Sequence, residues 1–223
     1  MSHLTVAKKI LVLILIAAFS IVILGGAGIH YLKEFKEEFD ELYEENLKPM
    51  VALTENRTHY RATQANILEM MLTTDERRRA ELRKDITERA GAVEKNMKLV
   101  EANIIAQEHP KEFKEFNEAA AEYRKAREDV FRLLDERKPA EAYILFNAQC
   151  NPMLNKLNKE LADLTALFDK DAVEMDQGME DTYKKTRLVF AAGILVMLLF
   201  MLFIGYRVAV MISKPLKDMS AYM

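Results

Sequence analysis

Two blocks of the chain are continuously apolar. Residues 10–30 and 188–206 contain no Asp, Glu, Lys or Arg. At 1.5 Å per residue, a helix of about twenty residues is roughly 30 Å long, which is the thickness of the hydrocarbon core of a bilayer. We therefore expect both blocks to be transmembrane helices. A cleaved signal peptide is the alternative for the first block, although signal-peptide cores are usually only ~7–15 residues long.

The segment between the blocks, residues 31–187, has apolar positions three and four residues apart, as in amphipathic helices. Three breaks divide it. Thr73 and Glu76 have the spacing of a capping box, which would start a new helix. Pro110 and Pro139 mark the other two breaks, because the residue before a proline is disfavoured in a helix. The expected helices are 31–73, 75–108, 110–137 and 139–187.

Apolar seams run along these helices. In the second, third and fourth helices they comprise Leu82, Ile86, Val93, Met97, Val100 and Ile104; Phe113, Phe116, Ala120, Tyr123, Val130 and Leu134; and Leu154, Leu157, Leu161, Leu164 and Phe168. Such seams with short connections favour an antiparallel bundle. The fold class expected is all-α, with two transmembrane helices flanking an extracytoplasmic up-down-up-down four-helix bundle.

Composition and charge agree with this fold and orient it. The 223 residues include only 7 Gly and 5 Pro, which argues against an all-β or loop-rich fold. The net charge is −3, yet the tails at residues 1–9 and 207–223 are both basic. The positive-inside rule places both tails in the cytoplasm, so residues 31–187 lie in the periplasm of a bacterium and the chain crosses the inner membrane twice. An acidic middle also excludes a nucleic-acid partner.

We find no pattern typical of catalysis, of a cofactor or of a metal site. His3, His30, His59 and His109 are scattered and form no pair at metal-ligand spacing. Cys150 is the single cysteine and lies on the seam of the last helix, where a small core residue is expected. The sequence therefore predicts a protein that is not an enzyme and needs no cofactor.

A polar interruption in the seam of the first bundle helix suggests a ligand site. Between residues 54 and 66 the seam is almost entirely polar. Arg57 and Arg61 are four residues apart beside Tyr60, and Gln64 follows one turn later. Guanidinium groups at this spacing lie on one face of a helix and can hold a carboxylate by two hydrogen bonds. The alternative is that both arginines pair with acidic side chains of neighbouring helices.

A stripe of asparagines on the last helix lies at the same height. Asn147, Asn151 and Asn155 recur every four residues, followed by Asn158. We take Asn151 and Asn155 as further ligand-site candidates. The alternative is ordinary surface polarity around Pro152, a residue that must disturb the local helical hydrogen bonds.

Four short stretches of the chain resemble bacterial methyl-accepting chemotaxis receptors with a four-helix-bundle sensor domain. The stretches are Leu4-Thr5-Val6-Ala7-Lys8-Lys9, Gly25-Gly26-Ala27-Gly28-Ile29, Leu42-Tyr43-Glu44-Glu45-Asn46-Leu47-Lys48-Pro49 and Ile212-Ser213-Lys214-Pro215-Leu216-Lys217-Asp218-Met219. The last resembles the start of a HAMP linker, so the resemblance implies that residues 207–223 begin this linker and that Pro215 takes part in signal transmission. The sequence ends at Met223, so we expect either a fragment of a longer receptor or a natural protein that lacks the output stage.

The resemblance implies a homodimeric receptor that binds a small molecule such as an amino acid or organic acid. Its downstream partner would be a signalling domain or a kinase and adaptor complex. We therefore expect the sensory and membrane-spanning module of a chemoreceptor. The alternatives are the input module of a sensor histidine kinase or cyclic-dinucleotide enzyme, because bundle sensors occur with several outputs, and a membrane-anchored helical scaffold that senses nothing.

Overall fold

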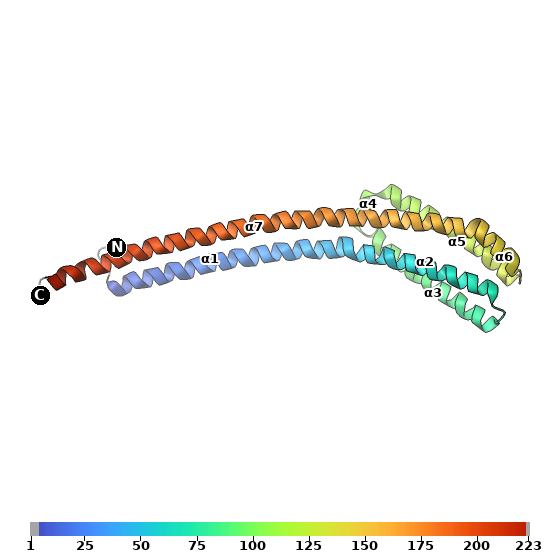
Figure 1. The fold of residues 1–223 in the computed structure, drawn as a ribbon, viewed down its shortest axis with the longest axis horizontal. Helices are drawn as coiled ribbons and strands as arrows, with labels where there is room; N and C mark the ends of the chain where they lie inside the picture. The colour runs from blue at the N-terminus through green and yellow to red at the C-terminus, as the bar shows by residue number, and fades with distance from the viewer. Residues whose placement is uncertain (1–4, 222–223) are drawn as a thin grey trace. The chain divides into compact units, whose positions relative to one another are not determined.

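The computed structural model describes the backbone of residues 5–221, and in this range every regular element is helical, which confirms the all-α prediction. Figure 1 follows the chain from α1 near the N-terminus to α7 near the C-terminus. The elements are α1 (Val6–Glu41), the π-helix η1 (Leu42–Leu47), α2 (Lys48–Leu72), α3 (Glu76–Glu101), α4 (Ile104–Glu108), α5 (Pro110–Asp135), α6 (Pro139–Leu145), the π-helix η2 (Phe146–Cys150) and α7 (Asn151–Ala221).

The chain forms two compact units. One is the bundle unit, Asp40–Asp176, and the other combines Met1–Phe39 with Gln177–Met223. Helices α1 and α7 each contribute residues to both units.

Helices α2, α3, α5 and the stretch from α6 into α7 enclose the core of the bundle unit. The predicted seams supply this core, because nearly all of their residues are buried. The largest fully buried side chains are Tyr123, Phe116, Phe146, Phe168, Leu53, Ile67, Leu154, Leu157, Leu161 and Leu164. One seam position was predicted wrongly: Ile104 is 55% exposed, whereas Ile105 is buried.

The error at Ile104 follows from a helix break that the sequence prediction missed. The second helix does not run from 75 to 108, because α3 ends at Glu101 and α4 begins at Ile104. Asn103 caps α4, its Oδ1 accepting a hydrogen bond from the Ile105 N–H at 2.9 Å. The break changes the helical register, so that Ile105 faces the core in place of Ile104.

Asn103 also donates a hydrogen bond to a backbone carbonyl that Pro49 leaves without its usual donor. In a regular helix residue 49 would donate its N–H to the carbonyl of Glu45, but proline has no N–H. The Nδ2 of Asn103 donates to that carbonyl at 2.8 Å instead. A buried asparagine thus joins the start of α4 to the segment that leads into α2.

Both π-helices precede a proline. Each ends two residues before it, η1 before Pro49 and η2 before Pro152. The N–H of Lys48 donates to the carbonyl of Tyr43, five residues back, and the N–H of Asn151 donates to Phe146 in the same way. The widened turn relieves the clash between a proline ring and the carbonyl four residues earlier, so the helix continues past each proline.

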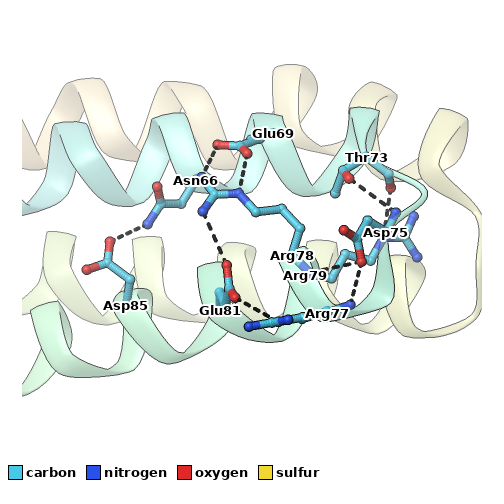
Figure 2. Close-up of polar contacts among 9 residues, drawn as sticks. All are labelled: Asn66, Glu69, Thr73, Asp75, Arg77, Arg78, Arg79, Glu81 and Asp85. Atoms are coloured by element: carbon cyan, nitrogen blue, oxygen red, sulfur yellow. Dashed lines mark hydrogen bonds and ion pairs between the residues drawn. The ribbon is translucent and has the colours of Figure 1, made fainter.

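The turn between α2 and α3 corrects the predicted capping box (Figure 2). Thr73 follows the last residue of α2 in an extended conformation, and its Oγ1 accepts from the Asp75 N–H at 3.2 Å. Asp75 caps α3 instead, with Oδ1 accepting from the N–H groups of Arg77 at 2.9 Å and Arg78 at 3.3 Å. The reciprocal Thr73–Glu76 box does not form, because the chain stays extended to Asp75 and α3 begins at Glu76.

Polar side chains tie α2 to α3 below this turn. Figure 2 shows Arg78 reaching from α3 to Glu69 on α2, with its Nε 2.6 Å and its Nη2 3.0 Å from the two carboxylate oxygens. One turn further from the loop, Asn66 Nδ2 donates to Asp85 Oδ2 at 2.6 Å. These bonds fix the register of the antiparallel hairpin.

The second unit holds both apolar blocks. The Tyr31 and Phe190 rings meet edge to face, with centroids 5.5 Å apart. The two helices also pack at glycines, where a Cβ at Gly28 would lie 3.9 Å from the Phe190 ring and one at Gly193 would lie 3.8 Å from Leu24, both ordinary van der Waals distances. The helical stretches Ile10–Leu72 and Pro139–Met211 each contain a window long and apolar enough to cross a membrane, and these windows are almost wholly exposed.

Candidate functional site

The predicted ligand-site residues come from α2 and from the beginning of α7. Gln64 and Asn151 meet directly, with Gln64 Nε2 donating to Asn151 Oδ1 at 3.1 Å. This bond joins the polar stretch of α2 to the asparagine stripe of α7. The fold therefore brings together two of the predicted residues that lie 87 positions apart in the sequence.

Arg57 and Arg61 lie on the same side of α2 as Gln64, two turns and one turn before it respectively. Arg57 is half-buried and Arg61 is exposed. Neither makes an ion pair with the residues that the structure describes, so no acidic side chain of a neighbouring helix neutralises them among these residues. By contrast, Arg78 and Arg83 each hold a carboxylate of another helix through two hydrogen bonds.

The other asparagines of the stripe have different environments. Asn155 is exposed, and Asn147 Nδ2 donates to the Tyr143 carbonyl of its own helix. Asn158 is half-buried, and its Oδ1 has no hydrogen-bond partner in the part of the chain that the structure describes. Of this stripe, Asn151 thus makes the contact to α2, while Asn155 stays at the surface. The predicted transmission residue, Pro215, is within the backbone of α7, but its side chain is outside the described residues.

Tyr60 is turned toward the interior, unlike the two arginines that flank it. It is 9% exposed, and its ring meets that of Tyr123 on α5 edge to face, with centroids 5.6 Å apart. Burial raises the pKa of Tyr60 to about 12, with Arg124 and Arg127 opposing the shift. The phenol is therefore neutral at physiological pH.

Much of the polarity in the α2 seam is compensated inside the bundle. Asn56 is fully buried, and its Oδ1 accepts from Asn96 Nδ2 of α3 at 3.1 Å. One orphan donor remains, because Asn56 Nδ2 has no partner among the described residues. The polar seam is therefore partly structural, which leaves Arg57 and Arg61 as its uncompensated charges.

The sequence also offers Arg124 and Arg127 on the third helix as donors for an anionic ligand, and Arg127 carries a further signal. It lies four residues after Tyr123 and three before Val130, which places it on the seam of α5. An arginine at a core position of a bundle helix is unusual, because charged residues are rarely buried. Its side chain is only 13% exposed in the structure.

Comparison with known proteins gives one match. Residues 3–183 match the family described as a four helix bundle sensory module for signal transduction. No curated protein and no solved structure matches the chain. The match covers more than half of the chain, including all of the bundle unit. The chain therefore belongs to the four-helix-bundle sensory modules for signal transduction, the non-catalytic sensor class that methyl-accepting chemoreceptors contain.

Proposed function

We propose that this chain is the sensory and membrane-spanning module of a bacterial chemoreceptor. It crosses the inner membrane at residues 10–30 and 188–206 and holds residues 31–187 in the periplasm. The bundle binds a small amino acid or organic acid. Residues 207–223 begin a HAMP linker that passes the signal to a downstream domain.

One observation carries the ligand-binding part of this proposal. Arg57 and Arg61 lack an acidic partner among the described residues, and they lie beside the Gln64–Asn151 hydrogen bond that joins α2 to α7. Arginine stays charged at all physiological pH values and presents a planar set of donors that suits a carboxylate. An anion bound here would meet donors from α2 and amide groups from both helices. Asn155, one turn along α7 from Asn151, is available to a ligand because it is exposed.

The membrane part rests on the apolar surface of the second unit. Large side chains such as Phe19, Ile21 and Leu198 are at least half exposed along both apolar blocks. An uncovered surface of this size is rare on a protein in water. Lipid would cover it, and the lysines at positions 8 and 9 would then stay on the cytoplasmic side.

Helix α7 would carry the signal from the bundle toward the cytoplasm. This helix belongs to both units, so a shift of its bundle part can pass along the helix toward Pro215 and the HAMP segment. Shifts of about 1–2 Å in a packed helix are a common form of such switching. A homodimer would supply the partner helices with which a HAMP linker forms its coiled coil.

In a second candidate function, the same sensor module is attached to a different cytoplasmic output domain. The same module can precede a sensor histidine kinase or a cyclic-dinucleotide enzyme, because function depends on the attached domains more than on the fold. Fusing residues 1–223 to the cytoplasmic part of a chemoreceptor and to that of a histidine kinase would compare the two. Ligand-dependent output from the kinase fusion alone would favour this second candidate.

Thermal unfolding of the 223-residue chain in lipid nanodiscs tests ligand binding directly. A panel of amino acids and organic acids should contain a compound that raises Tm, since a ligand at 100 times its Kd adds about 2.7 kcal/mol to stability. The gain should disappear in Arg57→Ala and Arg61→Ala. It should persist in Arg132→Ala, whose exposed side chain pairs with Asp129 of its own helix. A gain that survives both α2 substitutions, or no gain from any compound, would refute this site and favour the scaffold alternative.

A further inference from the structure

A polar cleft between α2, α3 and α5 opens to the surface of the bundle. It consists of two adjoining cavities of about 40 Å³ and about 190 Å³, which share Tyr60, Ala90, Val93, Ala120 and Arg124 in their walls. Ala90 and Ala120 occupy seam positions that hold larger side chains elsewhere along α3 and α5. The small side chains leave the space, and the cleft is distinct from the face that carries Arg57 and Arg61.

The smaller cavity is lined by a largely buried arginine, Arg127, that has no buried acidic partner among the described residues. Arg127 is 13% exposed, and its Nε has no hydrogen-bond partner among the described residues. Its single acidic neighbour there is Glu128, the next residue on the helix, at 3.5 Å and largely exposed. The guanidinium also lies near two rings, 6.0 Å from the centroid of Tyr123 and 5.7 Å from that of Phe131. Rings attract a cation but do not neutralise it.

The other groups around Arg127 supply no negative charge. Burial raises the pKa values of Tyr60 to about 12 and of Cys150 to about 11, and it also raises the pKa of Tyr123. All three are therefore neutral near pH 7. A buried arginine cannot become neutral by losing a proton, so an anion from solution is the remaining way to balance it.

Further donors face the same space. Arg124 lines both cavities and makes no ion pair with the described residues, although Lys98 chiefly, and Arg124 to a lesser extent, lower the pKa of Glu94 in the wall of the larger cavity. Arg89 lines the smaller cavity too, but its Nε is held by Asp85 at 2.7 Å. The Oη of Tyr123 is buried and has no hydrogen-bond partner among the residues described. The cleft thus offers two cationic groups and one unused hydroxyl to an anion.

The larger cavity is apolar on the side away from these donors. Val93, Met97 and Phe116 form this wall, and the exposed side chains of Glu94, Lys98, Glu101 and Asn117 complete the lining of the cavity. An enclosed cavity of about 150 Å³ accepts benzene. The larger cavity, about 190 Å³ and open to the surface, therefore has room for an apolar body of that size. The cleft therefore combines an anion-binding end with an apolar end.

We propose that this cleft binds a small organic carboxylate whose apolar body is about the size of a benzene ring. The carboxylate accepts hydrogen bonds from Arg127, Arg124 and the Tyr123 hydroxyl, and the apolar body lies against Val93, Met97 and Phe116. This is a second site, independent of the α2–α7 face, and it requires residues of α3 and α5 that the first site does not use.

Thermal unfolding and calorimetry of the whole chain in nanodiscs, with benzoate as the probe, test this site. Benzamide has the same shape without the charge, and inorganic phosphate has charge without the apolar body. We expect benzoate to raise Tm and benzamide and phosphate not to. Tyr123→Phe removes one hydrogen bond to a charged ligand and should weaken benzoate binding about tenfold. Equal effects of benzoate and benzamide, or an effect of phosphate alone, would overturn the proposal.

Two further variants separate ligand binding from a structural role of Arg127. Arg127→Met keeps an extended apolar side chain and removes the charge, so benzoate binding should be lost while Tm without ligand stays the same or rises. Ala120→Leu fills the cleft and should block benzoate without removing any donor. Arg61→Ala is the control and should bind benzoate normally. Loss of benzoate binding in Arg61→Ala, or normal binding in both Arg127→Met and Ala120→Leu, would contradict a site in the cleft.

Discussion

Substitution of Asn103 provides the sharpest test of how the bundle is held together near Pro49. The Asn103 side chain makes two bonds: Oδ1 caps α4 by accepting from Ile105 at 2.9 Å, and Nδ2 donates to the Glu45 carbonyl at 2.8 Å. Loss of an asparagine cap costs about 1 kcal/mol. An unpaired, partly buried carbonyl costs about 1–2 kcal/mol. We therefore expect Asn103→Ala to lower the free energy of unfolding by about 2–3 kcal/mol.

A second substitution divides this cost between the two bonds. In Asn103→Asp the carboxylate still caps α4, because aspartate and asparagine are equally good caps. It cannot donate to the Glu45 carbonyl and repels it. We expect a loss of about 1–2 kcal/mol at pH 7. The control Asn147→Ala removes an exposed side chain that bonds within its own helix and should change stability by less than about 0.5 kcal/mol.

The link to Pro49 can be measured in a double-mutant cycle. Pro49→Ala restores an N–H that can bond to the Glu45 carbonyl, so Asn103→Ala should cost less in that background by about 1 kcal/mol. The assay is urea unfolding of the whole chain in nanodiscs, followed by circular dichroism at 222 nm. Additive effects of the two substitutions, or an Asn103→Ala variant as stable as the wild type, would refute the role assigned to Asn103.

Three further predictions concern a surface pair, a buried phenol and the core. The Arg83–Asp135 pair joins α3 to α5 through bonds of 2.7 and 3.1 Å but is about half exposed, so a double-mutant cycle should give a coupling of about 0.5–1 kcal/mol that falls in 1 M salt. Burial raises the pKa of Tyr60 to about 12, so the neutral phenol contributes fully to stability below pH 10, and this contribution is lost between about pH 10 and 12. Urea unfolding across this range should show that the free energy of unfolding falls as the pH rises. This fall should be smaller by up to roughly 2–3 kcal/mol in Tyr60→Phe, which has no phenol to ionise. Leu161→Ala empties a fully buried site and should cost about 2–5 kcal/mol in the same assay, whereas Leu72→Ala, at a residue 84% exposed, should cost under about 1 kcal/mol.

Much of the candidate site could be predicted one helix at a time. The four-residue spacings of Arg57 with Arg61 and of Asn151 with Asn155 follow from helical periodicity, so each pair shares a face. The Gln64–Asn151 bond depends on how α2 and α7 are aligned, and this alignment arises from packing between helices. The inward position of Tyr60 likewise depends on its partner Tyr123 on α5.

The sequence by itself determined the helical class, the apolar blocks, the seams and the breaks at Pro110 and Pro139, because these depend on local periodicity and on proline geometry. Tertiary structure decided the rest. The break at Asn103 depends on a tertiary contact, because the asparagine that caps α4 also donates to the carbonyl, 58 residues away, that Pro49 leaves free. The cleft at Arg127 exists because small residues on two different helices face each other there, so its volume and its unbalanced charge arise only when the bundle closes.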